Sequence, residues 1–388
     1  MLITKQTRDK QLTYYRMLKS TGSLSKLFSE SLSPYLVSRN VENAYCEAFE
    51  ADNLGRADCS ADAALQGVGV GIKTFLHGNG RTLQKIAEFN KDSDLYRNKS
   101  PKDLIETVAT LRNERIELTK RTYELDSMIY HCVTRGPGKI YVFESPMDLI
   151  DISYIKNVKV SNKNTITFED NRNEYSFNIT KSTLYKRFHT ENPLVEIDVK
   201  ILSNPYLALA TMKDFNQETL PVKEEAIPLP LEVTDHAESI VLPLFSDRGS
   251  KRHVPEKSGL NQWNASGRAR NANEIYIPVP SWIHKEFAGF FPPRDQSFQL
   301  RLPDKGLLSA KLCQENRKAL MSNPNSALGE WLLRQVMNLG EKELLTYAQL
   351  KVLGIDSVVV YKHSESHYSI DFCEIGSYDH FESESKNS

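Results

Sequence analysis

The segment from Asn216 to Glu238 is the feature that most constrains how this chain can fold. Its sequence, NQETLPVKEEAIPLPLEVTDHAE, holds three prolines and clustered acids without a periodic apolar pattern. Proline lacks the backbone N–H that helices and sheets use, so such a stretch is typical of a linker. We therefore predict a linker at 216–238 between two domains, at residues 1–215 and 239–375. We expect the acidic tail at 376–388 to be disordered.

The charge balance excludes a uniformly basic nucleic-acid binder. The 388 residues include 49 Lys and Arg and 50 Asp and Glu, which gives a net charge of −1. Positive charge for a nucleic acid must then be local. Apolar runs stay below the roughly 18 residues of a membrane span, the N-terminus lacks a secretory signal, and the five cysteines form no CxxC pair. We expect a cytoplasmic protein without membrane contact or structural zinc.

Hydrophobic periodicity predicts a mixed α/β first domain and a mainly β second domain. The first domain is expected to contain helices at Val41–Glu50, Arg81–Lys91 and Pro101 to about Val133, a strand at Gly67–Phe75, and a later β-meander. Ser100 is the expected cap of the long helix, with Pro101 in its first turn. The second domain shows short strands with a few helical patches, which indicates a small barrel-like fold.

An acid followed by a lysine marks a candidate catalytic site in the first domain. Asp62 precedes a short glycine-rich gap, and Lys73 lies in the next strand. In many nucleases a carboxylate holds Mg²⁺ and such a lysine adds positive charge near the attacked phosphate. The pattern resembles the PD-(D/E)XK nuclease core, whose second acid would stand at Gly71. Glu88 is the preferred substitute metal ligand beside Asp62, and Glu47 and Glu50 are weaker candidates. The alternative is that Asp62 caps a turn and Lys73 is a surface residue.

The glycine-rich run GVGVG, Gly67 to Gly71, is not a phosphate loop. It lacks the GxxxxGK[ST] order that cradles nucleotide phosphates, so we expect no nucleotide cofactor. Its glycines would instead let a metal, DNA or another strand approach closely.

A basic, amide-rich segment forms the first of two candidate DNA-reading arms in the second domain. Arginine and lysine hold phosphates and read guanine, whereas asparagine and glutamine read adenine. The candidate contacts of the first arm are Arg248, Arg252, Lys257, Asn261, Gln262, Trp263, Asn264, Arg268, Arg270 and Asn271. Those of the second arm are Gln314, Asn316, Arg317, Lys318, Ser322 and Asn323. The alternative for either arm is a solvated loop, and Trp263 is either a base contact or an anchor.

Three long strings carry a second resemblance. They are PEKSGLNQWNASGRARNANEIYIPVP, GFFPPRDQSFQLRLPDKGLLSAKLCQENRKALMSNPNSALGEWLL and GIDSVVVYK. This part is similar to the C-terminal recognition domain of the NgoFVII-like restriction endonucleases, which implies a B3-like pseudobarrel whose two arms enter the major groove. The phospholipase D type of nuclease domain common in that family needs an HxK motif. None of the nine histidines is followed two residues later by lysine.

The two resemblances together imply a Type II restriction endonuclease. A PD-(D/E)XK-like α/β core would cut double-stranded DNA with Mg²⁺, and the B3-like domain would select the sequence. Cutting both strands takes two active sites or two passes, so we expect a homodimer at least on DNA. The alternative is a sequence-specific DNA-binding protein that does not cut, whose degenerate nuclease domain serves dimerisation or regulation.

Overall fold

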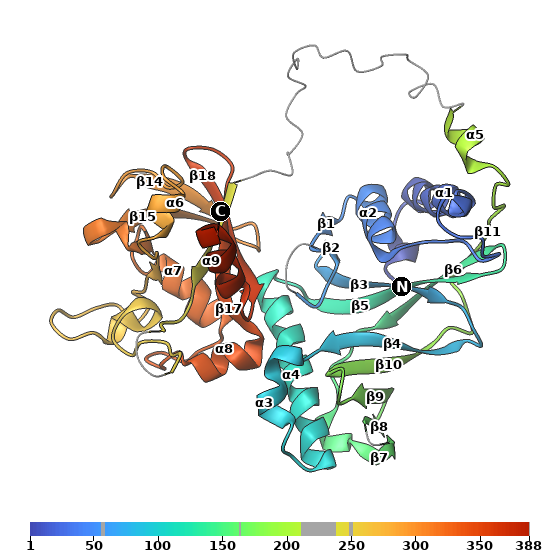
Figure 1. Cartoon of the computed structure of the whole chain (residues 1–388), viewed down its shortest axis with the longest axis horizontal. Coiled ribbons are helices and arrows are strands. Elements are labelled where there is room, and N and C mark those ends of the chain that lie inside the picture. The colour runs from blue at the N-terminus through green and yellow to red at the C-terminus, as the bar shows by residue number, and fades with distance from the viewer. Residues whose placement is uncertain (56–58, 163, 211–237, 248–250, 388) are drawn as a thin grey trace. The chain divides into compact units, whose positions relative to one another are not determined.

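The computed structural model of the chain describes residues 1–55, 59–162, 164–210, 238–247 and 251–387 (Figure 1). The chain forms two compact units, and each unit combines several separate segments of the sequence. The first comprises Met1–Arg56, Ser60–Glu88 and Leu125–Thr234, and the second comprises Ala57–Cys59, Phe89–Glu124 and Asp235–Ser388. The predicted linker lies outside the described residues up to its last member, Glu238.

A six-stranded sheet in the order β1-β2-β3-β5-β6-β11 organises the first unit. Its strands are β1 (Asp52–Asn53), β2 (Ala63–Leu65), β3 (Val68–Leu76), β5 (Ser127–Gly136), β6 (Lys139–Pro146) and β11 (Val195–Asp198). β3 and β5 run parallel, with Lys73 opposite Cys132. The β2–β3 hairpin turns at Gln66 and Gly67, whose φ angles of 53° and 75° suit a two-residue hairpin loop.

Two helices, α1 (Arg8–Ser23) and α2 (Ser38–Phe49), cover one face of this sheet (Figure 1). The predicted helix at Val41–Glu50 is confirmed by α2. Side chains alternate along β3, and Val70 and Ile72 join the hydrophobic core beneath the helices. Gly71 and Lys73 therefore face the opposite side of the sheet. The first unit also contains the short helices η1 (Ile3–Lys5), η2 (Ser25–Leu27), η4 (Ile152–Tyr154) and α5 (Pro205–Ala210).

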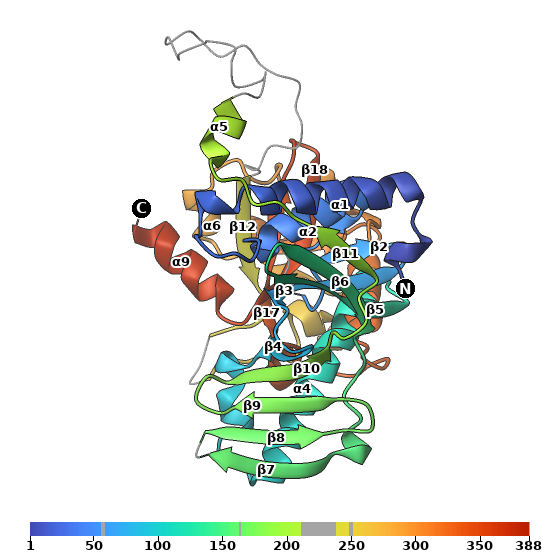
Figure 2. The same cartoon turned by 90° about the vertical axis from the view of Figure 1, so that its right-hand side faces the viewer.

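A second sheet of the first unit has the order β4-β10-β9-β8-β7, visible as a ladder in Figure 2. Its strands are β4 (Arg81–Glu88), β7 (Lys156–Asn162), β8 (Thr165–Glu169), β9 (Glu174–Asn178) and β10 (Thr183–His189). Strands form at all four predicted meander segments, β6 to β9, but only β7, β8 and β9 pair with one another in sequence, because β6 lies in the first sheet between β5 and β11. Phe188 of β10 lies against Phe75 and Tyr130 of the first sheet, with ring centroids 6.0 and 5.0 Å apart.

Two helix predictions need correction. Arg81–Lys91 has apolar residues at helical spacing, yet Arg81–Glu88 forms strand β4, which pairs with β10 from His189 to Thr183. Pairing with a distant strand overrides a weak local pattern. The long helix α4 (Pro101–Thr122) begins as predicted, because Ser100 Oγ accepts a hydrogen bond from the Asp103 N–H at 3.4 Å. It ends before Val133, since the chain from Ser127 onward pairs with β3.

The second unit is built on a nearly closed, barrel-like sheet in the order β12-β17-β18-β14-β15-β16-β13. Its strands are β12 (Glu238–Pro243), β13 (Ile277–Pro278), β14 (Ser297–Arg301), β15 (Leu307–Cys313), β16 (Ala319–Ser322), β17 (Ile355–Lys362) and β18 (His367–Glu374). Its helical segments are η3 (Asn90–Asp92), α3 (Ser93–Tyr96), η6 (Gly259–Asn264), α6 (Ile283–Glu286), η7 (Glu315–Arg317), α7 (Ala327–Gly329), the π-helical η8 (Glu330–Val336) and α8 (Tyr347–Leu353). This architecture is consistent with the predicted B3-like pseudobarrel.

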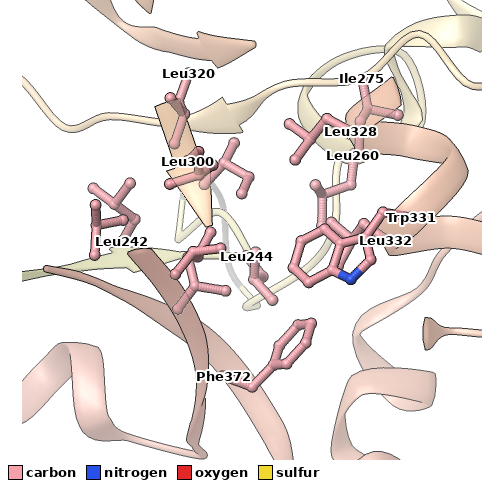
Figure 3. Close-up of a cluster of buried hydrophobic side chains, with 14 of the residues drawn as sticks. Leu242, Leu244, Leu260, Ile275, Leu300, Leu320, Leu328, Trp331, Leu332 and Phe372 are labelled. Carbon is pink, nitrogen blue, oxygen red and sulfur yellow. The ribbon is translucent and has the colours of Figure 1, made fainter. Parts of the chain in front are cut away.

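Leucines from the strands and helices fill the interior of the barrel (Figure 3). Leu242, Leu300 and Leu320 come from three different strands and are each no more than 1% exposed. The indole ring of Trp331 stacks on Phe372, with centroids 5.5 Å apart and planes at 28°. This core holds the bases of the loops that leave the barrel.

Phe89–Glu124, which the sequence analysis places in the first domain, packs with the second unit. Leu118 of α4 belongs to the barrel core. The Arg121 guanidinium donates to the Val336 carbonyl at 3.1 Å, and the Tyr123 hydroxyl lies 3.1 and 3.2 Å from the two carboxylate oxygens of Asp371. The second unit therefore takes a helix from between β4 and β5, two strands of the first unit.

The expectation of a disordered acidic tail is wrong, because Ser377–Asn387 forms helix α9. Its aromatic side chains explain the order. Phe381 stacks on Phe287 at 5.4 Å, and the indole N–H of Trp282 donates to the Tyr378 hydroxyl at 3.0 Å. The acidic composition of this segment therefore wrongly predicts disorder, because its apolar residues recur on one helical face and pack against the barrel.

Candidate functional site

Asp62 and Lys73 lie close together at the start of the β2–β3 hairpin. The Asp62 N–H donates to the Val70 carbonyl at 2.9 Å, and its Oδ2 accepts from the Ile72 N–H at 2.6 Å. These bonds hold the carboxylate beside β3, one residue before Lys73. Burial raises the pKa of Asp62, while the Ile72 N–H and the charge of Lys73 lower it. The structure thus brings together the predicted acid and lysine.

Apolar side chains occupy the space at Gly71, where the nuclease pattern has its second acid. A Cβ atom there would lie 2.5 Å from Met147 Cε and 3.3 Å from Tyr130 Cδ1. Met147 and Tyr130 are both buried. The glycine therefore permits close approach of a methionine and a tyrosine, and a carboxylate at this position would displace them.

Glu88 lies at the end of β4 in the second sheet. Its carboxylate is half-exposed and pairs with Lys85 Nζ at 2.9 Å. The charged groups with the largest effect on the pKa of Asp62 are Lys73, Glu42 and Arg39. Within the described residues, no three His, Cys, Asp or Glu side chains gather as metal ligands would. Glu88 therefore stays a predicted ligand.

Glu42 on α2 is an acidic neighbour of Asp62 that the sequence analysis did not consider. Its carboxylate is buried, accepts from Arg39 Nη1 at 3.1 Å, and acts electrostatically on Asp62. The signal was present in the sequence, because Glu42 falls on the same helical face as the buried Tyr45. A carboxylate on the apolar face of an amphipathic helix is unusual and indicates a specific role or partner. Glu42 already forms an ion pair with Arg39.

Asp62 and Glu42 are the two carboxylates that could hold a Mg²⁺ ion near Lys73. Mg²⁺ is commonly bound through one or two carboxylates and retains several waters. Asp62 fits such a role, since Oδ1 accepts no hydrogen bond within the described part of the chain. Glu42 fits it only if Arg39 moves away.

In the first arm, several predicted DNA contacts hold the fold together. Asn261 is fully buried, donates to the Pro255 and Leu345 carbonyls at 3.1 and 2.9 Å, and accepts from the Leu345 N–H. Arg270 Nη1 donates to the Ala265 carbonyl at 2.9 Å. Trp263 packs against the barrel core, so it anchors the arm. Gln262 is half-buried beside it, and Arg248 lies outside the described residues.

Arg252 is also engaged within the second unit. Its guanidinium lies 3.9 Å from the Phe245 ring centroid, donates to Asp247 at 2.9 and 3.2 Å, and pairs with Asp379 of α9. Asp356, which is fully buried, lies 3.7 Å away. These partners assign Arg252 to packing of the barrel against α9.

Four predicted residues of the first arm remain exposed for contact with a ligand: Lys257, Asn264, Arg268 and Asn271. Arg268 forms a charged hydrogen bond with the buried Glu274, yet its side chain is 59% exposed. A buried carboxylate beneath an exposed guanidinium limits the conformations that the guanidinium adopts. The loop that carries these residues extends outward from the barrel, drawn in yellow in Figure 1.

The predicted second arm comprises the short connection between β15 and β16, the strand β16 itself and Asn323 directly after it. Gln314, Asn316 and Arg317 have φ angles of 66°, 59° and 55°, a left-handed conformation that costs energy in residues other than glycine. Asn316, Lys318 and Asn323 are exposed, and Gln314 and Arg317 are half-buried. Ser322 is buried, and its hydroxyl bonds to the Pro324 carbonyl and the Leu328 N–H, both at 2.8 Å, so it stabilises the turn after β16.

Comparison with known proteins finds similarity in the second unit. The family model of the NgoFVII C-terminal B3-like DNA-binding domain matches residues 233–364, a span that includes both arms. No curated protein matches the chain. Among the described residues, no helix combines the length and apolar character needed to cross a membrane. Over the matched span, the chain is therefore similar to the B3-like domain of the NgoFVII family.

Proposed function

We propose that this protein binds double-stranded DNA at a specific sequence through its second unit. The observation that carries the proposal is the similarity of residues 233–364 to a B3-like DNA-binding domain. Two exposed arms rich in amides and cations support it, because these side chains read base edges and hold phosphates. The overall charge near zero agrees with a local binding surface.

The exposed residues divide by chemistry. Arg268 suits bidentate recognition of guanine, and Asn271 and Asn316 suit adenine. Lys257 and Lys318 are compact charges for phosphates, which position the duplex without reading it.

The experiment is selection of duplexes from a random pool by the full-length protein, followed by competition between the selected and scrambled duplexes at fixed salt. Enrichment of one sequence supports the proposal. Equal affinity for all duplexes would contradict it. Lys342→Ala, at an exposed lysine remote in sequence from both arms, is the matched control and should bind like the unmodified protein.

DNA cleavage by the first unit is a second candidate function, favoured by the proximity of Asp62 to Lys73. Bound Mg²⁺ would polarise the phosphate and lower the pKa of a water molecule. Asp62 would be its ligand, with Glu42 or the originally predicted Glu88 as the second carboxylate, and Lys73 would place positive charge beside the attacked phosphate. A homodimer on DNA would then bring two such sites to the two strands. Packing at Gly71 and the Arg39–Glu42 pair favour the alternative, a binding protein that does not cut.

Incubation of the protein with phage DNA, with and without Mg²⁺, distinguishes a DNA-cleaving protein from one that only binds DNA. Discrete Mg²⁺-dependent fragments would support a sequence-specific endonuclease, and Lys73→Ala should then abolish cutting while sequence-specific binding persists. Lys26→Ala, at a surface lysine of η2, is the control and should cut normally. Binding without any cleavage would favour the non-catalytic alternative.

A further inference from the structure

The tip of the second arm is held in its left-handed conformation by a side chain from outside the arm. His284 lies on α6, and its Nε2 atom is 3.0 Å from the carbonyl oxygen of Arg317. Because a carbonyl oxygen only accepts, Nε2 must carry the proton. Arg317 is one of the residues with positive φ, so this bond fixes the peptide at the most constrained point of the arm.

The base of the arm is fixed by backbone bonds next to this contact. The Val279 N–H donates to the Lys318 carbonyl at 2.9 Å, and Cys313 pairs with Ala319 in the β15–β16 register. Between these anchors, the backbone bond from the Arg317 N–H to the Gln314 carbonyl is long, at 3.3 Å. The backbone contributes only this long bond within the tip, and the His284 side chain adds a shorter one at the Arg317 carbonyl.

We propose that His284 is a positioning residue for DNA recognition by the second arm. It acts through the arm: by fixing the Arg317 carbonyl, it orients the neighbouring Asn316 before DNA arrives. Pre-organisation of this kind raises affinity by reducing the ordering that binding must impose. The inference rests on the proposed DNA-binding function. The inference adds His284, a residue outside both predicted arms, to those that determine how well the second arm distinguishes DNA sequences.

The variants separate positioning from contact and from folding. His284→Leu removes the donor, whereas His284→Gln keeps an N–H that can reach the same carbonyl. Asn316→Ala truncates a predicted base contact at the tip, and His284→Leu/Asn316→Ala combines the two. His363→Gln is the matched control, because His363 bonds to Ser369 Oγ at 2.7 Å in the β17–β18 turn.

Affinity is measured for the selected duplex and for duplexes with single base-pair changes. Loss of one hydrogen bond predicts about a three- to ten-fold weaker binding by His284→Leu, confined to the base pairs that also lose discrimination in Asn316→Ala. His284→Gln should retain most of the affinity. The double variant should bind no more weakly than Asn316→Ala, since His284 acts through the same tip. A uniform loss over all base pairs, or additive losses, would overturn the inference.

Hydrogen exchange tests the same contact without DNA. The amides of residues 314–318 should exchange faster in His284→Leu than in the unmodified protein, with the first arm unchanged. Unchanged exchange at the tip would also overturn the inference, whatever the folding stability of the variant. If the unmodified protein shows no sequence preference, the proposed function fails. That failure can be told apart from failure of the inference, because hydrogen exchange measures the effect of His284 on the tip without DNA.

Discussion

Arg252 donates hydrogen bonds at 3.0 and 2.9 Å to the two carboxylate oxygens of Asp379, a residue 127 positions later in the chain. The sequence analysis interprets Arg252 as a DNA contact and the segment of Asp379 as a disordered tail. In the structure the pair fastens α9 to the barrel. The basic segment therefore combines two kinds of arginine, and the exposed fraction of the arginine side chain separates them, 26% for Arg252 and 59% for Arg268.

We expect Arg252→Ala to destabilise the second unit by about 3 kcal/mol, because it leaves the buried Asp356 without its cation. Thermal denaturation checks this. Arg294→Ala, at an exposed arginine that pairs with its neighbour Asp295, should change the free energy of unfolding by less than about 1 kcal/mol. Equal effects of the two substitutions would contradict the structural role of Arg252.

Arg268 and Arg270 should respond differently to truncation. Arg268→Ala should cost about 1–3 kcal/mol of binding and relax one recognised base pair, as expected for a guanine contact. Arg270 is half-buried and bound to loop carbonyls, so Arg270→Ala should weaken all sequences alike by loosening the arm. Competition with singly substituted duplexes distinguishes these outcomes, and the reverse pattern would exchange the two roles.

Two asparagines of the same segment make a matched pair. Asn261→Ala should lower the free energy of unfolding by about 1–3 kcal/mol, because it leaves the buried carbonyls of Pro255 and Leu345 and the Leu345 N–H without partners. Asn271 is exposed, so Asn271→Ala should leave stability nearly unchanged and reduce sequence preference. Denaturant titration and duplex competition measure the two effects. A stable Asn261→Ala variant would be inconsistent with this assignment.

An acid cannot simply be restored at Gly71. Gly71→Ala should cost only about 1 kcal/mol, because the nearest atom, Met147 Cε at 2.5 Å from the position of the new Cβ, ends a flexible side chain that can shift. Gly71→Asp should cost more, since it also buries a charge. Gly136→Ala is the control in the adjacent strand, where the nearest atom is at 3.4 Å, and should cost less than about 1 kcal/mol. Denaturant unfolding tests the order, and Met147→Ala should partly rescue Gly71→Asp.

The pKa of Asp62 makes stability depend on pH. Burial raises this pKa, so the folded state holds the proton more tightly than the unfolded state does. The free energy of unfolding therefore falls as the pH rises from the unfolded pKa, about 3.9, through the folded pKa. Asp62→Asn keeps an oxygen for the Ile72 N–H and removes the buried charge, so the variant should be more stable than the unmodified protein at pH 7.

Denaturation of Asp62→Asn at several pH values provides the measurement. The variant should show a shallower change in stability across the acidic range than the unmodified protein. Asp198→Asn, at an exposed carboxylate near Lys139, is the control and should change little. A less stable Asp62→Asn variant at pH 7 would mean that the Lys73 charge outweighs burial.

The sequence by itself determined the features that depend on local chemistry. These features are the Ser100 cap before Pro101, the strand at Gly67–Phe75, the individual strands of the predicted meander and the resemblance of the second domain. The structure and the family comparison agree with them. Only the tertiary structure decided features that depend on distant partners. It paired Arg81–Glu88 with β10, and it placed Met147 against Gly71. It also set Glu42 beside Asp62 and fixed His284 on the second arm. Such contacts join residues far apart in the chain, and no local pattern records whether a polar side chain faces a ligand or a buried partner.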